Sequence, residues 1–421
     1  MKITAPKGTR DILPDETFAW QWLERTFQQV CNQYGYQEIR LPTFEQTELF
    51  SRGVGDTTDV VQKEMYTFLD KGERSMTLRP EGTAGVVRSF LENGMASWPS
   101  PVRLSYNINA FRYENVQKGR YREFHQFGVE AFGAKGPEID AELITLLALY
   151  FNKLGLQETK LQINSIGCPA CRELYHQILK QYLGSKLKDL CTTCRQRYDK
   201  NPLRILDCKE ERCRQATADA PVLLDHLCDG CQDHFNGLKR ELDDIELPYT
   251  VNPRIVRGLD YYTRTVFEFI SEHVGTQGTI CGGGRYDGLV KTMGGPETPG
   301  IGFALGVERL LMELRAQAIQ LPEAPGCDLY LAAAGQTGAA VRKLAWQMRQ
   351  AGLAVETDLM NRSLKAQMKY AGKNKLPYVM VLGEDEIRQQ TAMIRCLETG
   401  QEQSVRLDRI EAIAAIVRDQ K

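Results

Sequence analysis

The hydrophobic positions of the first 41 residues predict a helix followed by a strand. Hydrophobic side chains recur at the i, i+4, i+7 and i+11 spacing of one helical face, at Leu23, Phe27, Val30 and Tyr34. Asp15 is expected to cap the beginning of this helix, and Gly35 is expected to end it. Hydrophobic and charged residues then alternate over residues 38–41, which indicates a strand with one buried face.

Alternation over residues 102–132 predicts a long antiparallel hairpin. On its first strand one face holds Val102, Leu104, Tyr106, Ile108 and Ala110. The polar segment 114–120 turns the chain, and residues 122–132 return. Gln126, Gly128 and Glu130 share a face of the second strand, the amide and the carboxylate about 13 Å apart, with an open floor where glycine has no side chain. Arg112 faces the same pocket if even-numbered residues pair with even-numbered ones.

The pattern of elements predicts two domains. A helix over residues 138–157, a Cys-rich helical insertion over about 165–235, strands and glycine turns over 250–300 and a helix after Gly302 belong to a first domain, residues 1–324. Pro322-Glu323-Ala324-Pro325-Gly326 reads as a linker. Strands (328–333, 354–357, 378–382) then alternate with helices (341–350, 363–373), which predicts a small α/β domain over residues 326–421 with a mostly parallel sheet.

Composition is that of an ordinary soluble globular protein. Of the 421 residues, 42% are hydrophobic and 25% are charged. No apolar run approaches the roughly 18 residues that span a bilayer, and the N-terminal residues carry no apolar signal core. We therefore expect a cytoplasmic protein without a membrane partner. The formal net charge of −1 gives no general attraction for nucleic acid, so such contacts must rest on local basic patches.

Eight of the twelve cysteines lie in close pairs between residues 168 and 231: Cys168/Cys171, Cys191/Cys194, Cys208/Cys213 and Cys228/Cys231. A reducing cytosol disfavours disulfides. The four pairs could supply two tetrahedral Zn²⁺ sites with four thiolate ligands each. A helical insertion that merely tolerates cysteine accounts for the same pairs, and both interpretations stay open.

Three other segments carry candidate binding residues. Residues 257–264 place Arg257 beside Tyr261 and Tyr262, just ahead of a strand-like run, an arrangement that suits an anion next to a small polar ring. Glu81 and Thr83 place a carboxylate and a hydroxyl in a turn, where they could hold a ligand ammonium or cap a helix.

The third segment, residues 300–309, sets glycines before Arg309. Glycine lets a nucleotide approach the backbone closely, but neither the Rossmann nor the P-loop spacing is present. Residues 281–288 read as a further glycine turn, in which Tyr286 would close the pocket; a tight connection between two strands would show the same pattern.

Together these segments resemble the histidyl-tRNA synthetases, a family of class II aminoacyl-tRNA synthetases. The resemblance covers nearly the whole chain and is most specific over residues 111–130, 257–262 and 302–309. It implies an α+β fold: an antiparallel catalytic sheet with flanking helices, the Cys-rich insertion, and a C-terminal α/β anticodon-binding domain. It also implies a homodimer that activates L-histidine with ATP and Mg²⁺ to histidyl-adenylate and transfers it to the 3′ end of histidine tRNA.

The resemblance also implies residue roles. Arg112 and Arg257 would stabilise the charge that builds on the α-phosphate, and Arg309 would hold the ATP tail and adenine. The histidine-binding residues would be Glu81, Thr83, Gln126, Glu130, Tyr261, Tyr262 and Tyr286. Glu130 and Tyr262 would hold the two imidazole nitrogens, since a neutral imidazole has one donor and one acceptor.

Contacts with tRNA rest on local basic groups. The hairpin tip, with Gln117, Lys118 and Arg120, would reach the acceptor end. In the C-terminal domain Lys365, Lys369 and Lys373 form a stripe that could meet the anticodon, although such a stripe is also typical of a solvated helix face.

Two alternatives remain. A non-catalytic regulatory subunit of ATP phosphoribosyltransferase shares the catalytic fold, but such proteins generally lack the extra C-terminal domain and depart from the pattern at residues 257–262. A zinc-ribbon nucleic-acid module explains the cysteines but leaves unexplained Arg112, Gln126, Glu130, Arg257 and Arg309.

Overall fold

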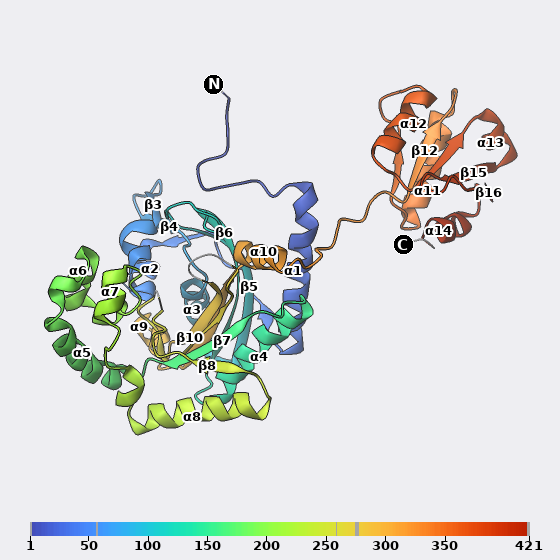
Figure 1. The fold of residues 1–421 in the computed structure, drawn as a ribbon. Helices are drawn as coiled ribbons and strands as arrows, with labels where there is room; N and C mark the ends of the chain where they lie inside the picture. Colours follow the sequence, from blue (N-terminus) through green and yellow to red (C-terminus); the bar gives the residue numbers. More distant parts are fainter. Residues whose placement is uncertain (1, 56–57, 258, 274–277, 419–421) are drawn as a thin grey trace. The chain divides into compact units, whose positions relative to one another are not determined.

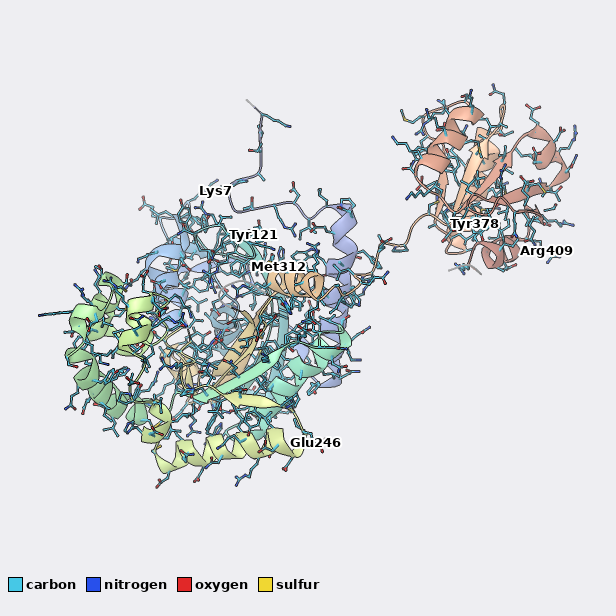
Figure 2. The ribbon with its side chains drawn as sticks, viewed as in Figure 1. Lys7, Tyr121, Glu246, Met312, Tyr378 and Arg409 are labelled. Carbon is cyan, nitrogen blue, oxygen red and sulfur yellow. The ribbon has the colours of Figure 1, made fainter. Side chains whose placement is uncertain are left out.

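The computed structural model describes residues 2–55, 58–257, 259–273 and 278–418. The chain divides into two compact units, Met1–Pro322 and Glu323–Lys421 (Figure 1). In Figure 2 the labelled Lys7, Tyr121, Glu246 and Met312 belong to the first unit, and Tyr378 and Arg409 to the second. None of the described helices combines the length and the hydropathy that crossing a bilayer requires.

An eight-stranded sheet forms the centre of the first unit. Its strands, in spatial order, are β1 (Gln37–Glu38), β5 (Val102–Phe111), β6 (Glu123–Phe132), β11 (Gly300–Gly306), β10 (Thr279–Arg285), β9 (Thr263–Ile270), β7 (Lys160–Ser165) and β8 (Tyr249–Val251). The inner strands pair antiparallel, while the two outer pairs, β1–β5 and β7–β8, are parallel. This confirms the predicted antiparallel catalytic sheet.

Helices cover both faces of this sheet. On one face the core packs α1 (Pro14–Gln33), α4 (Glu138–Lys153) and α10 (Val307–Ala316) against odd-numbered residues of β6 such as Phe127 and Val129. On the other face α3 (Thr83–Glu92) and α9 (Leu289–Thr292) pack on even-numbered residues of β5, including Tyr106. The remaining elements of this side are α2 (Thr47–Val54), η1 (Val60–Glu64), η2 (Met95–Ser97) and a three-stranded sheet, β2 (Phe44–Gln46), β4 (Ser75–Leu78) and β3 (Tyr66–Leu69).

The insertion is helical, as predicted. It comprises α5 (Pro169–Gly184), η3 (Leu187–Asp189), α6 (Thr192–Lys200), η4 (Pro202–Ile205), α7 (Glu211–Ala216), η5 (Leu223–His226) and the start of α8 (Asp229–Asp244). A small core of its own contains Tyr175, Leu179, Leu183 and Ile205.

The second unit is a five-stranded sheet of order β13-β12-β14-β15-β16. Its elements are β12 (Leu329–Ala333), α11 (Gly338–Gln350), β13 (Val355–Thr357), α12 (Leu364–Lys373), β14 (Tyr378–Leu382), α13 (Glu384–Gln389), β15 (Thr391–Cys396), β16 (Glu402–Arg406) and α14 (Ile410–Arg418). The first three strands are parallel, as predicted, but β15 and β16 pair antiparallel. The expectation of a mostly parallel sheet is therefore wrong for this half.

Five local expectations also need correction. Helix α1 begins at Pro14 with Leu13 as its cap residue, so Asp15 lies in the first turn and is not the N-cap; proline suits the first helical position because its φ is preset. The predicted strand over residues 38–41 is the short β1, and α4 ends at Lys153. The helix expected after Gly302 begins at Val307, since residues 300–306 are the strand β11. Of the glycine turn expected over residues 281–288, residues 281–285 belong to β10, and the chain turns only at residues 287–288.

Candidate functional site

Glycines in the central sheet let long side chains lie flat on its α3-facing side. A Cβ at Gly128 would stand 2.3 Å from the ring of Tyr106, and one at Gly282 would stand 2.3 Å from the guanidinium of Arg257. Such separations are shorter than real side chains tolerate, so these positions require glycine. The open floor predicted at Gly128 is wrong, because the ring of the directly opposite Tyr106 fills it.

Glu130 is the fully buried carboxyl group of this surface. Thr83 Oγ1 donates a hydrogen bond to its Oε1 at 2.7 Å, and Tyr286 donates to its Oε2 at 2.5 Å. Tyr106 also donates to Oε1, at 3.2 Å. Burial raises the pKa of Glu130 to about 8, with a further push from the Glu81 carboxylate, and this outweighs the hydroxyl donors. At neutral pH the group therefore holds a proton.

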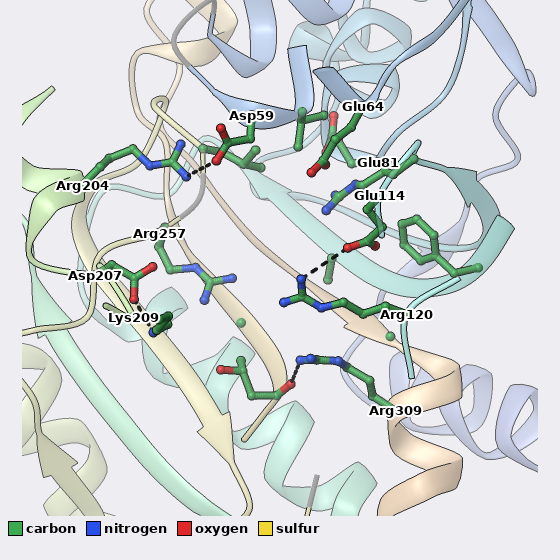
Figure 3. A pocket seen from close by; sticks show the side chains of 18 of the residues that line it. Asp59, Glu64, Glu81, Glu114, Arg120, Arg204, Asp207, Lys209, Arg257 and Arg309 are labelled. Carbon is green, nitrogen blue, oxygen red and sulfur yellow. Dashed lines mark hydrogen bonds and ion pairs between the residues drawn. The ribbon is translucent and has the colours of Figure 1, made fainter. Parts of the chain in front are cut away.

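A cavity of about 860 Å³ opens on this side of the sheet. It brings together most of the residues singled out in the sequence: Glu81, Thr83, Arg112, Arg120, Gln126, Arg257, Tyr261, Tyr262 and Arg309. Figure 3 shows Arg120, Arg257 and Arg309 pointing into the same space. Glu130 and Tyr286 are not part of its described lining and lie behind it, with Thr83 connecting Glu130 to the wall. Gly258, within the same sequence motif, lies outside the described residues.

The hairpin register explains how two of these residues reach the cavity. Ile108 pairs with Gln126 and Leu104 with Glu130, so even-numbered residues pair as expected. Arg112 continues that face, and its Nε donates to the carbonyl of Pro80 at 2.8 Å.

The other two arginines are held where the end of β9 pairs with the start of β10. Arg257 is ion-paired with Glu268 of β9. Burial by itself would lower the pKa of the Arg257 guanidinium, but the Glu268 carboxylate raises it above its usual value. Arg309 donates to the carbonyl of Thr279 at 2.5 Å. The cavity thus presents fixed cations on several sides, which suits a polyphosphate.

Glu81 takes the helix-capping role that the sequence left open. Its two oxygens accept hydrogen bonds from the backbone amides of Thr83 and Ala84 at 2.7 and 2.8 Å. It nevertheless lines the cavity, and burial raises its pKa. One carboxylate therefore fixes the start of α3 and remains available to a ligand.

The hairpin tip divides into exposed and inward-facing residues. Gln117 and Lys118 are exposed, and Gln117 forms a bridge with Arg120. Arg120 turns inward, where it pairs with Glu114 at 3.4 Å beside the cavity. Sequence reasoning missed this inward position, and it also missed Glu268 and Tyr106. For Tyr106, its place opposite Gly128 in the predicted register was an available signal.

The eight paired cysteines gather into two clusters of four. Cys168, Cys171, Cys228 and Cys231 form one, and Cys191, Cys194, Cys208 and Cys213 form the other. We call these the inner and outer clusters. In each, all sulfur atoms lie within 4.8 Å of one another. The sequence did not decide which pairs combine, because that depends on how the insertion folds back on itself.

Comparison with known proteins gives the site its family. A family model described as histidyl-tRNA synthetase matches residues 8–310, and one described as an anticodon binding domain matches residues 329–418. The histidine–tRNA ligase of Acetivibrio thermocellus is 58% identical over 409 residues, which cover 97% of this chain and 98% of that protein. The structure of apo S. aureus histidyl-tRNA synthetase is 38% identical, with a TM-score of 0.83 over 98% of this chain and 99% of that one.

These matches place the chain among the class II aminoacyl-tRNA synthetases. It belongs to the histidyl-tRNA synthetase family. A structure described as an ATP phosphoribosyltransferase regulatory subunit/histidyl-tRNA synthetase from Bacillus halodurans shares the fold, with a TM-score of 0.64 at 22% identity. The regulatory-subunit alternative is not favoured, because the high-identity, full-length relatives are histidine–tRNA ligases.

The packing of Tyr106 on Gly128 can be tested by adding one methyl group. Gly128→Ala should displace the phenol from Glu130 and cost about 1–3 kcal/mol of unfolding free energy, with loss of histidine binding. Gly230→Ala, where a Cβ meets nothing within 4 Å, is the matched control. Urea unfolding and histidine titration would measure both, and equal behaviour of the two variants would contradict the packing described here.

The raised pKa of Glu130 predicts a pH-dependent stability. Because an unfolded glutamate releases this proton near pH 4.3 and the folded protein keeps it up to about pH 8, the unfolding free energy falls as the pH rises from about 4.3 to about 8 and levels off above that. Glu130→Gln removes this titration. Between pH 6 and 9 the wild-type protein should lose more unfolding free energy than Glu130→Gln does, and parallel curves would show that Glu130 is ionised.

Proposed function

We propose that the chain activates L-histidine with ATP to form histidyl-adenylate, and transfers the histidyl group to the 3′ end of histidine tRNA. Histidine–tRNA ligation is the activity of the family to which it belongs. The observation that carries the proposal is one cavity in which histidine-binding candidates adjoin Arg112, Arg257 and Arg309. An amino acid and a nucleoside triphosphate must be bound side by side in order to react.

In the first step a carboxylate oxygen of histidine attacks the α-phosphorus of ATP, and pyrophosphate leaves from the opposite side. Negative charge grows on the phosphate oxygens during the attack. Arg112, directly after β5, and Arg257, lying on β10, approach this charge from two directions, and a single well-placed donor of this kind is worth about 3–4 kcal/mol in the transition state. Arg309 holds the rest of the ATP molecule.

ATP would carry Mg²⁺, which neutralises phosphate charge. The carboxylates Glu64 and Glu114 line the same cavity and are the oxygen donors that this cation prefers. Burial raises the pKa of Glu64, which an approaching cation would reverse.

Histidine selection rests on Glu130 and Tyr262, which would hold the two ring nitrogens, with Tyr261 and Tyr286 beside them. Thr83 Oγ1 occupies Glu130 Oε1, so ring entry requires this hydroxyl to turn aside. Glu81, Thr83 and Gln126 would bind the ammonium and carboxylate groups. A buried Oε1 of Gln126 without a hydrogen-bond partner supports its availability to a ligand.

The RNA contacts follow from exposure. Gln117 and Lys118 project from the hairpin tip, and Arg120 lies deeper, where the terminal nucleotide must arrive. In the second unit Lys365, Lys369 and Lys373 are exposed along α12, where phosphates of the anticodon arm could bind.

A cytoplasmic homodimer completes the proposal. The three-stranded sheet exposes Phe44, Phe68 and Leu69, and an apolar face of this kind suits a second copy of the chain. No disulfide joins any of the twelve cysteines, all of which lie in the described part of the chain, and this is consistent with a reducing compartment.

We further propose that each cysteine cluster holds a structural Zn²⁺ ion. Tetrahedral coordination at a Zn–S distance of about 2.3 Å separates the sulfurs by about 3.8 Å. Cys168 Sγ lies 3.6 Å from Cys171 Sγ and 3.9 Å from Cys228 Sγ, and Cys191 Sγ lies 3.9 Å from Cys208 Sγ. Backbone amides of Cys228 and Cys191 also point at sulfur atoms, at 3.1 Å, as they do around thiolate ligands.

Removing the Arg257 guanidinium tests the adenylation chemistry. Arg257→Ala should lower the rate of histidine-dependent pyrophosphate exchange by about 10²–10³-fold and abolish tRNA charging. The companion Arg257→Ala/Glu268→Gln avoids an unpaired buried carboxylate. Arg103→Ala, which breaks the pair with Glu142 elsewhere in this unit, is the control and should exchange normally. Near-normal exchange by Arg257→Ala would refute the assigned role.

Zinc occupancy predicts a stoichiometry. Protein purified without chelators should contain two zinc ions per chain by elemental analysis, and Cys228→Ser should lower this to one. Cys396→Ser, a cysteine of β15 outside both clusters, should leave it at two. Zinc-free protein with an ordered insertion would overturn the zinc proposal without affecting the ligase assignment.

A further inference from the structure

The cysteine-rich insertion contacts the very segment that carries Arg257. Asn201 Nδ2 donates to Asp260 Oδ1 at 3.0 Å, and Arg172 Nη1 donates to the carbonyl of Tyr262 at 3.1 Å. Just ahead of the segment, Arg254 Nη2 donates to the carbonyl of Ala218 at 2.5 Å. Side chains of the insertion thus hold residues 257–264 through the Asp260 carboxylate and the backbone carbonyl of Tyr262.

This segment has little regular structure to hold it. The described residues between β8 and β9 form turns and bends, without helix or strand. Ile255 and Tyr262 pack in a small cluster with Ile166 and Val266, and Asp260 N donates to the carbonyl of Val54 at 3.3 Å. The position of Arg257 therefore depends on contacts from neighbouring elements, of which the insertion supplies three.

Two of these contacts, those of Asn201 and Arg172, come from helices whose first turn carries residues of a cysteine cluster. Cys191 caps α6 and Cys194 lies in its first turn, while Asn201 is the residue that ends α6. Cys168 likewise caps α5, and Arg172 follows Cys171 directly. The clusters thus stand at one end of the two helices that reach Asp260 and Tyr262.

Helix α6 has few hydrophobic contacts. Cys194 is its sole buried residue, and Tyr198 packs on the core of the insertion with its hydroxyl donating to the carbonyl of Lys180 at 3.0 Å. Arg197 pairs with Asp59 of the catalytic unit at 3.1 Å, and Arg204 reaches the same carboxylate at 3.6 Å. Figure 3 shows Arg204 and Asp59 joined in this way, with Asp207 and Lys209 of the insertion facing Arg257. Because most of α6 is polar, its cysteine end and these ion pairs contribute to fixing its position.

We infer that zinc bound by the two clusters positions the Arg257–Arg264 segment for adenylate formation, so that the insertion serves the chemical step that needs no tRNA. The inference rests on the proposed zinc occupancy and on the proposed role of Arg257. Asn201 and Arg172 are then positioning residues, which act through Asp260 and Tyr262 and touch no substrate.

The test measures zinc content and histidine-dependent pyrophosphate exchange in the same preparations, without tRNA. Cys208→Ser should lose one zinc ion and show a kcat about tenfold or more below that of the wild-type chain, since small displacements of a catalytic group cost rate. The KM for histidine should rise in the same variant, because Tyr261 and Tyr262 lie on the displaced segment together with Arg257. Cys208→His, which restores a zinc ligand, should recover both zinc and rate, and Cys327→Ser, in the second unit, is the cysteine control.

Asn201→Ala provides a variant that leaves the cysteines intact. It should keep two zinc ions and still lose several-fold in kcat. If the wild-type protein binds two zinc ions but Cys208→Ser and Asn201→Ala both catalyse exchange at the normal rate, the inference is overturned and zinc binding stands. A wild-type protein without zinc that exchanges at full rate would overturn zinc binding and the inference together, while the ligase function would stand.

Discussion

The site depends on close contact between large polar side chains and glycines of the central sheet. Tyr106 lies on Gly128, Arg257 on Gly282, and Glu130 against Gly302, where a Cβ would stand 1.7 Å from its Oε2. The three glycines lie on β6, β10 and β11, which pair antiparallel. The registers of these strands place all three on the same side of the sheet. Without these glycines the three side chains would be pushed off the sheet and into the cavity above it.

The same arrangement sets the electrostatics. Glu130 is buried beneath three hydroxyl groups and holds a proton at neutral pH, whereas Arg257 keeps its charge because Glu268 lies beside it. Burial raises the pKa of the Tyr286 phenol well above its ordinary value, so this group stays a hydrogen-bond donor. Neutral polar groups therefore surround one end of the site and fixed cations the other. An uncharged imidazole and a polyphosphate suit these two ends.

The sequence predicts the features that depend on the periodicity of hydrophobic and polar residues. Alternation gave the hairpin, its even-numbered register and the shared face of Gln126 and Glu130, and the motif at residues 257–262 identified Arg257. It does not show which side chain crosses from a neighbouring strand, so it predicts an open space over Gly128 that Tyr106 fills. Glycines 282–284 were read as a turn because glycine usually marks one; here they are needed inside a strand. The grouping of the cysteines and the hydrogen bonds of Asn201 and Arg172 depend on tertiary packing, which produces no periodic pattern in the sequence.

The central claim is that this cavity activates histidine and no other amino acid. It is tested most directly by pyrophosphate exchange into ATP with each of the twenty amino acids, using purified zinc-containing protein and no tRNA. The account predicts exchange with histidine alone, since an apolar ring of the same size would leave Glu130 and Tyr262 without partners, a mismatch that discriminates by roughly 10⁴–10⁵-fold. Exchange with another amino acid, or none at all from folded protein, would contradict it.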